Sequence, residues 1–175
     1  MIWGVGTGRC GTMSAAKEWH GVHEPGGLEW DNIEVRLKQR LADGRPCFDA
    51  RQSHCLPQIF KLDPDAVIVW LIRYPTDFVQ SAVNFHAVLQ NHPDPYFWKD
   101  SYTDKEALYL AAELWININC RIYLATLNHQ VVLRRTEGLK YFENVNEKRR
   151  AIHVPGNMFA SLMNTYDGLL SEFNE

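Results

Sequence analysis

The segment that most constrains the fold is a continuous run of seven apolar residues, "AVIVWLI", at Ala66–Ile72. A strand with one solvated face alternates apolar and polar residues, whereas an unbroken apolar run rich in β-branched residues indicates burial on both faces. Strands of this kind lie in the middle of parallel sheets, which carry helices on both sides. The segment therefore predicts a central strand of an α/β fold.

The rest of the chain alternates weaker strand patterns with helical ones. Shorter strands are expected at Ile2–Val5, Gly21–Glu24, Pro46–Ala50 and Gln130–Arg135. Helical spacing of apolar residues predicts helices at 12–20, 28–41, 75–90, 105–127 and 157–173. The alternation predicts a single α/β domain over residues 1–175, a three-layer sandwich with a mainly parallel central sheet. One long irregular segment, 91–104, is aromatic and contains proline, and we expect it to form a lid or substrate wall.

Composition restricts the function classes. Hydrophobic residues make up 46% and charged residues 22%, as in ordinary globular proteins, and the formal net charge is −3. This charge argues against coating nucleic acid by bulk electrostatics, so no nucleic-acid partner is expected. No apolar run approaches the roughly 20 residues that span a membrane, no signal peptide is recognisable, and the four cysteines lack metal-ligand spacing. We therefore expect a cytoplasmic, reduced protein with no membrane partner and no metal site.

A glycine-rich loop follows the first predicted strand, in "GVGTGRCGTMS" at residues 4–14. A loop of this kind between a strand and a helix usually binds phosphate. Gly6 and Gly11 have the separation of the triphosphatase loop G-x-x-x-x-G-K-[ST]. The next two positions, however, are Thr12 and Met13 instead of a lysine and a hydroxyl that binds magnesium. The metal-dependent chemistry of that loop therefore lacks its ligand.

A dinucleotide-binding loop is the second interpretation. Gly6, Gly8 and Gly11 satisfy G-x-G-x-x-G, and Glu24 follows at a tolerable distance for an acid that binds ribose. This motif alone is weakly specific, and the strand before it is only a few residues long.

A second anion site is indicated directly after the strand at Ala66–Ile72. Arg73 stands at the carboxyl end of that strand, on the edge where α/β folds bind ligands, and Ser81 follows in the next predicted helix. A guanidinium fork and a hydroxyl suit an isolated phosphate. Together with the glycine loop, this suggests a nucleotide that is phosphorylated at both ends.

These two stretches resemble the paired signatures of sulfotransferases that use 3′-phosphoadenosine-5′-phosphosulfate (PAPS). The second family motif, R-x-P-x-[D/E]-x-x-x-S, is matched by Arg73, Pro75, Asp77 and Ser81. Weaker similarity extends to "LWININ" at 114–119 and "LRRTEGL" at 133–139. The resemblance implies a P-loop-like fold and transfer of the sulfuryl group from PAPS to a hydroxyl or amine of a small-molecule or glycan acceptor, without a metal.

The resemblance also implies roles for individual residues. Arg9 occupies the position of the basic residue that serves the bridging oxygen of the leaving group, and is expected to be catalytic. Backbone N–H groups of residues 10–14 should surround the 5′-phosphate, with hydroxyls from the same loop, and the second motif should hold the 3′-phosphate. The expected set that binds the nucleotide is Gly8, Arg9, Cys10, Gly11, Thr12, Met13, Ser14, Arg73 and Ser81.

Glu24 is the expected catalytic base, because many family members place a glutamate at the end of the strand after the first helix. The alternative role for Glu24 is to cap the helix that follows. Other family members use a histidine as the base, so a histidine remains the alternative to Glu24. His20 and His23 lie nearby, but we expect both to be surface or half-buried histidines.

Other positions keep two interpretations. Ser53 and His54 fall where family members place substrate contacts, although a helix N-cap explains Ser53 equally well. The basic run 148–150 is either a loop over the 3′-phosphate or a solvated face. A nucleotide-binding protein of related fold, NAD-dependent or kinase-like, and a non-catalytic module that binds 3′-phosphoadenosine-5′-phosphate (PAP) remain the alternatives to the enzyme.

Overall fold

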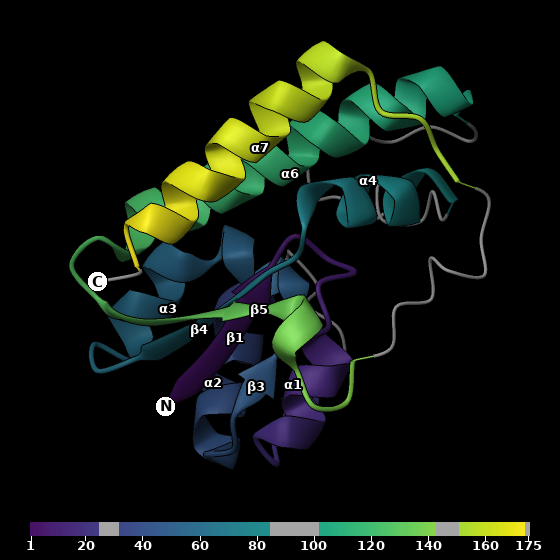
Figure 1. Ribbon diagram of the computed structural model, residues 1–175. Helices are drawn as coiled ribbons and strands as arrows, with labels where there is room; N and C mark the ends of the chain where they lie inside the picture. The colour runs from purple at the N-terminus through teal and green to yellow at the C-terminus, as the bar shows by residue number, and fades with distance from the viewer. Residues whose placement is uncertain (25–31, 85–101, 143–150, 174–175) are drawn as a thin grey trace. The chain divides into compact units, whose positions relative to one another are not determined.

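A computed structural model describes residues 1–24, 32–84, 102–142 and 151–173 of the chain (Figure 1). The chain divides into two compact units. The first consists of residues 1–72 and 118–142, and the second of residues 73–117 and 143–175. The long helix α6 (Asp104–Thr126) contributes residues to both units.

The first unit contains a five-stranded sheet in which all strand pairs are parallel. Its strands are β1 (Ile2–Gly6), β2 (Val22–His23), β3 (Cys47–Phe48), β4 (Val67–Ile72) and β5 (Gln130–Arg135). The spatial order is β2-β3-β1-β4-β5, so β4 lies between β1 and β5. Residues 68–72 of β4 are all buried, as the apolar run predicts. The prediction of an α/β fold with a parallel central sheet is confirmed.

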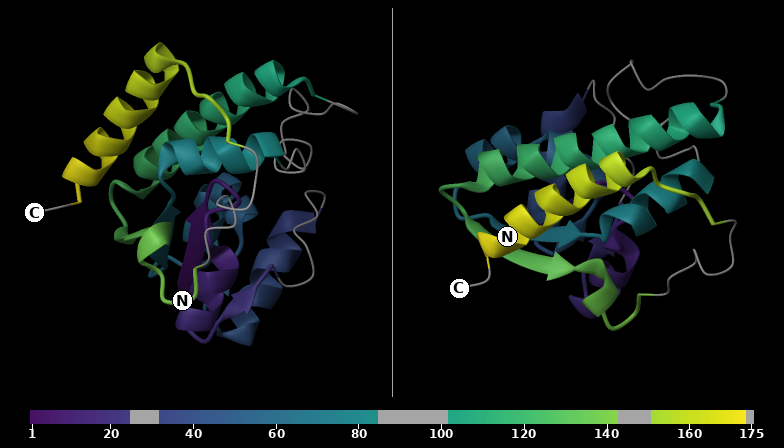
Figure 2. Two further views of the ribbon diagram at one scale, coloured as in Figure 1. Left: turned by 45° about the vertical axis from the view of Figure 1, so that its right-hand side comes forward. Right: turned by 45° about the horizontal axis from the view of Figure 1, so that its top comes forward.

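Helices cover both faces of this sheet (Figure 1 and Figure 2). The chain moves one way along the sheet from β1 to β2 and the opposite way in the later connections, and right-handed crossovers then place the connecting helices on opposite faces. These helices are α1 (Thr12–Glu18), α2 (Ile33–Asp43), α3 (Leu56–Leu62) and residues 118–126 of α6.

Buried contacts show which helices lie on which face. On one face, Ala15 and Ala16 of α1 share an apolar cluster with Phe48, Val69 and Leu71. On the other face, Trp3 donates a hydrogen bond to Asp63 at the end of α3 (2.8 Å), and Trp70 donates to Asn119 of α6 (3.0 Å). The first unit is therefore a three-layer arrangement with the sheet in the middle.

Two short elements between β3 and β4 were not predicted from the sequence. A 3-10 helix, η2 (Ala50–His54), follows β3, and α3 follows it directly. A helix of seven residues is too short to display a clear apolar period, but Pro57 in its first turn is a typical start signal. Predicted helix 28–41 begins at Ile33 in the structure, and residues 25–31 lie outside the described ranges.

The second unit contains α4 (Pro75–Asn84), residues 104–117 of α6, and α7 (Gly156–Ser171). Phe78 and Ala82 on one side of α4 are fully buried. The indole of Trp115 donates to the carbonyl of Arg73 (3.1 Å), and the ring of Tyr166 on α7 meets Tyr74 edge to face at 5.5 Å. Three predicted helices are thus confirmed where the structure describes them.

The start of α6 is fixed by a capping box. The hydroxyl of Thr103 accepts from the N–H of Glu106 (3.2 Å), and the Glu106 carboxylate accepts from the N–H of Thr103 (3.0 Å). The predicted lid, 91–104, falls outside the described residues except at its last three positions. No helix within the described ranges is both long and apolar enough to span a membrane.

Candidate nucleotide site at the carboxyl edge of the sheet

The connections that follow β1 and β3 leave this pair of adjacent strands toward opposite faces of the sheet. After β1 the chain enters α1 on one face, and after β3 it enters η2 and α3 on the other. Open α/β sheets bind ligands outside the carboxyl ends of their strands at such a reversal. The glycine loop occupies this position, because it joins β1 to α1 across residues 7–11.

The loop has a left-handed backbone at three of its residues. Gly8 has φ 79°, Arg9 φ 50° and Gly11 φ 80°. Left-handed residues placed among right-handed ones turn successive N–H groups to a common side and build concavities that bind anions. The first hydrogen bond of α1 joins Ala15 N–H to the Gly11 carbonyl at 2.9 Å, so the N–H groups of residues 12–14 are not used by the helix.

Ser53 fixes the start of the loop. Its buried hydroxyl accepts from the N–H of Gly6 (2.9 Å) and donates to the carbonyl of the same residue (2.6 Å). Ser53 lies inside η2, whose N-cap is Asp49, and the N-cap of the following α3 is Cys55, so the N-cap interpretation of Ser53 is wrong. The hydroxyl of Ser53 holds the backbone where β1 turns into the loop.

The atoms around Gly6 leave no room for a side chain at this position. A Cβ there would lie 2.4 Å from the Cys10 sulfur and 2.8 Å from the Leu71 carbonyl oxygen. Cys10 itself is fully buried in the apolar cluster under the loop. Cys10 therefore offers a ligand its backbone and not its thiol.

Thr136, just after β5, holds the other end of the loop and was missed by sequence reasoning. Its buried hydroxyl lies 2.8 Å from the carbonyl of Cys10 and 3.2 Å from that of Ile72, and donates to both. A small hydroxyl residue directly after a strand was the available signal. Its partner is 126 residues away, so sequence spacing could not reveal the contact.

The hydroxyls expected to bind phosphate have partners within the first unit. The Thr12 hydroxyl lies 3.0 Å from Nε2 of His23, and the Ser14 hydroxyl donates to the carbonyl of Tyr141 (3.0 Å). A ligand would have to share or replace these contacts. The side chain of Met13 is largely exposed.

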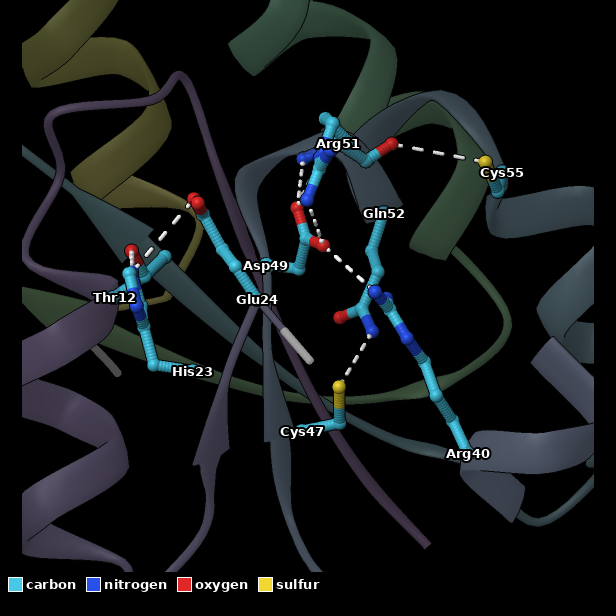
Figure 3. A network of polar contacts seen from close by, with 9 residues as sticks. All are labelled: Thr12, His23, Glu24, Arg40, Cys47, Asp49, Arg51, Gln52 and Cys55. Atoms are coloured by element: carbon cyan, nitrogen blue, oxygen red, sulfur yellow. Dashed lines mark hydrogen bonds and ion pairs between the residues drawn. The ribbon is translucent and has the colours of Figure 1, made fainter. Parts of the chain in front are cut away.

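Glu24 follows β2 directly, at the same edge of the sheet as the loop. Its N–H donates to the Phe48 carbonyl (3.1 Å), its φ is 42°, and its carboxylate is 3.7 Å from Nε2 of His23. Because His23 also contacts Thr12, the structure brings Glu24 and the glycine loop together through one histidine (Figure 3). Helix α2 has Asn32 at its N-cap, so Glu24 does not cap it.

A buried charge network lies where β3 ends, and sequence reasoning missed it (Figure 3). The Asp49 carboxylate, which is fully buried, accepts from Arg40 Nη2 (2.9 Å) and from Nε and Nη2 of Arg51 (both 3.0 Å). Burial alone would raise the pKa of Asp49, but the hydrogen bonds and charges of Arg51 and Arg40 outweigh it and hold that pKa below its ordinary value.

Two cysteines border this network. Burial raises the pKa of the Cys47 thiol above its ordinary value and that of Cys55 to about 12. Both therefore stay protonated thiols at neutral pH. The available signal for the network was an aspartate placed directly after a strand, in "PCFDA".

The remaining predicted residues lie in several places. Arg73 directly follows β4 and is 2% exposed, and Ser81 is fully buried in α4. Both belong to the second unit, whereas the glycine loop and Glu24 belong to the first. His54 contacts Arg121 of α6 at 3.0 Å. The basic run 148–150 lies outside the described residues.

Comparisons of the chain with protein-family models, with curated proteins and with solved structures find no match. Function therefore has to be argued from the residues at the carboxyl edge of the sheet.

Proposed function

We propose that this chain is a sulfotransferase that moves the sulfuryl group from PAPS to a hydroxyl or amine of a small-molecule or glycan acceptor. The observation that carries the proposal is the strand, loop and helix at residues 2–18, in which Arg9 of the loop has a left-handed backbone conformation. Thr12 and Met13 stand where a triphosphatase carries its lysine and magnesium ligand. The loop thus suits an anion that is held by N–H groups and a guanidinium.

The loop of the first unit suits the 5′ end of such a nucleotide. The N–H groups of residues 12–14, which α1 does not use, and the concave loop suit the 5′-phosphosulfate. Gly11 has no space for a larger residue, because a Cβ there would lie 2.8 Å from Cγ2 of Thr136. Arg73 and Ser81 are the proposed partners of the 3′-phosphate, from the motif that they share with the family.

The proposed chemistry uses two side chains of the first unit. Glu24 would accept the proton of the acceptor hydroxyl while the acceptor oxygen bonds to sulfur. Arg9 would stabilise the charge that develops on the bridging oxygen as the bond from sulfur to the 5′-phosphate breaks, and PAP would leave. PAPS supplies the activated sulfuryl group, and the chain supplies position, a base and positive charge.

Thermal unfolding with a panel of nucleotides tests the proposal. A ligand at 100 times its Kd stabilises the native state by about 2.7 kcal/mol, which raises the Tm of a chain of this length by roughly 5–10 °C. We expect this shift with PAP, and no comparable shift with NAD or with ATP and magnesium. Stabilisation by NAD or ATP without any effect of PAP would contradict the proposal and favour a related nucleotide-binding protein.

Two variants separate binding from catalysis. Arg73→Ala should weaken PAP much more than adenosine 5′-phosphosulfate, which lacks the 3′-phosphate, and equal losses would remove Arg73 from that role. Glu24→Gln should keep PAP binding but lose transfer of labelled sulfate from PAPS to a panel of acceptors. A wild-type chain that binds PAP and transfers to none of them would instead fit the non-catalytic module.

A further inference from the structure

The network at the end of β3 joins one buried carboxylate to two guanidinium groups. One carboxylate, that of Asp49, pairs with two guanidinium groups, those of Arg40 and Arg51. The side chain of Arg40 is only 5% exposed, so Arg40 neutralises Asp49 inside the protein. Arg51, whose side chain is 30% exposed, is the guanidinium of this network that reaches the surface.

Asp49 also fixes the orientation of the Arg51 guanidinium. It binds Nε and Nη2 on one edge of the fork and the backbone N–H of the same residue (2.9 Å). Two of the five guanidinium N–H donors are used in this way, which leaves three, two on Nη1 and one on Nη2. Nη1 has no hydrogen-bond partner within the ranges that the structure describes. This second edge has the geometry that binds an oxyanion with two parallel hydrogen bonds.

The position of Arg51 connects it to the proposed site of transfer. It lies in η2, which packs against β1 and carries the serine that holds Gly6. Burial alone would lower the pKa of Arg51, but the hydrogen bonds and charge of Asp49, with a contribution from the charge of Glu24, raise it above its ordinary value. Arg51 therefore stays charged, and it lies within electrostatic reach of the proposed base (Figure 3).

We infer that the outer edge of the Arg51 guanidinium is a preformed oxyanion site, which takes a sulfate or carboxylate group beside Glu24 during transfer. This inference rests on the proposed function, because that function supplies two sources of such a group. One is the sulfo group of the nucleotide. The other is an acidic group on the acceptor, such as the carboxylate of a uronic acid.

The experiment observes the Arg51 side chain directly. In a sample with ¹⁵N-labelled arginine, the Nε–H signal of Arg51 is assigned by its disappearance in Arg51→Lys. Methyl β-D-glucuronide and neutral methyl β-D-glucoside are added separately in the presence of PAP, and PAPS is compared with PAP alone. A shift with glucuronide but not glucoside identifies the acceptor as the source, and a shift with PAPS but not PAP identifies the sulfo group. If neither anionic ligand moves the signal, or the glucoside moves it equally, the inference is overturned.

Arg45 provides a matched control. It also pairs through Nε and Nη2 with one carboxylate, that of Asp43 (3.0 and 2.9 Å), but it is exposed and precedes β3 instead of following it. Arg51→Lys keeps the positive charge and loses the fork, so the Kd of the anionic ligand should rise at least about tenfold. Arg45→Lys should leave that Kd within about twofold, because surface pairs contribute little.

The same samples separate this inference from the proposed function. Backbone amide signals of the glycine loop report PAP binding independently of Arg51. If PAP does not shift the loop amide signals of the wild-type chain, the sulfotransferase proposal is contradicted. The response of the Arg51 signal to glucuronide still tests the anion site in that case. A chain that binds PAP normally but leaves the Arg51 signal unmoved by PAPS and by glucuronide keeps the proposed function and loses this site.

Discussion

Removing the charge of Asp49 should destabilise the first unit more than any surface charge change. Asp49→Asn keeps the shape of the side chain but presents an uncharged amide to Arg40 and Arg51, which now donate three side-chain hydrogen bonds to the carboxylate. Arg40 is 6% exposed, so a largely buried charge would lose its ion pair with Asp49. Breaking a buried ion pair in this way costs about 3–5 kcal/mol. That is a large part of the roughly 5–15 kcal/mol that holds a domain folded.

Urea unfolding followed by circular dichroism measures this loss. In thermal unfolding, the Tm should fall by roughly 6–20 °C for a chain of this length. Asp43→Asn is the control, because Asp43 pairs with the exposed Arg45, and such a pair contributes only about 0–1 kcal/mol. Adding Arg40→Met to Asp49→Asn should recover part of the stability, since the buried cation that lost this carboxylate is then gone. Equal losses in Asp49→Asn and Asp43→Asn would refute the reasoning that Asp49 neutralises a buried cation.

Three further changes test the loop and the network. Ser53→Ala should lower the free energy of unfolding by about 1–3 kcal/mol, measured with urea, because the buried N–H of Gly6 loses its hydroxyl partner. Ser53→Thr keeps the hydroxyl but adds a methyl group at a buried position, so it should not restore full stability. Gly6→Ala should weaken PAP binding by calorimetry and destabilise by about 1–3 kcal/mol or more, since its Cβ would lie 2.8 Å from the backbone oxygen of Leu71; unchanged binding would show that the loop can move. The pKa of Asp49 is depressed in the native state, so its stabilisation is fully present above the ordinary carboxyl pKa of about 3.9 and is lost as pH falls through the lower native value. The urea concentration at the unfolding midpoint should therefore decrease when the pH is lowered below about 4, and this decrease should be smaller in Asp49→Asn.

The elements that could be predicted from the sequence are those whose pattern is local. The run at Ala66–Ile72 needs no partner to be recognised, and the structure places β4 at Val67–Ile72. Helix α6 was expected at 105–127 and spans Asp104–Thr126, because many apolar repeats define it. The seven residues of α3 offer too few repeats, so its existence could not be inferred in the same way.

In the candidate site, too, features that depend on local sequence could be predicted, and features that depend on distant contacts could not. The positions of Arg9 and Glu24 at strand ends follow from the order of elements, and the structure places both at the carboxyl edge of the first unit's sheet. The contacts that shape the site join residues far apart in the chain, such as Ser53 with Gly6, 47 residues away. No local pattern encodes such a pair, and spacing does not reveal that Arg40 is buried while Arg51 reaches the surface.

The long-range hydrogen bonds that hold the glycine loop and α1 also have a consequence for folding kinetics. Cys10 accepts from Thr136, Ser14 donates to Tyr141 and Glu18 accepts from the N–H of Lys140, across 126, 127 and 122 residues of chain. Contacts of such long sequence separation carry a large loop-closure entropy and slow folding. The glycine loop, though encoded near the start of the chain, should be among the last parts to become ordered. Under the proposed function, PAP present during refolding would bind only after β5 has joined the sheet, so the appearance of binding would mark the end of folding and not its beginning.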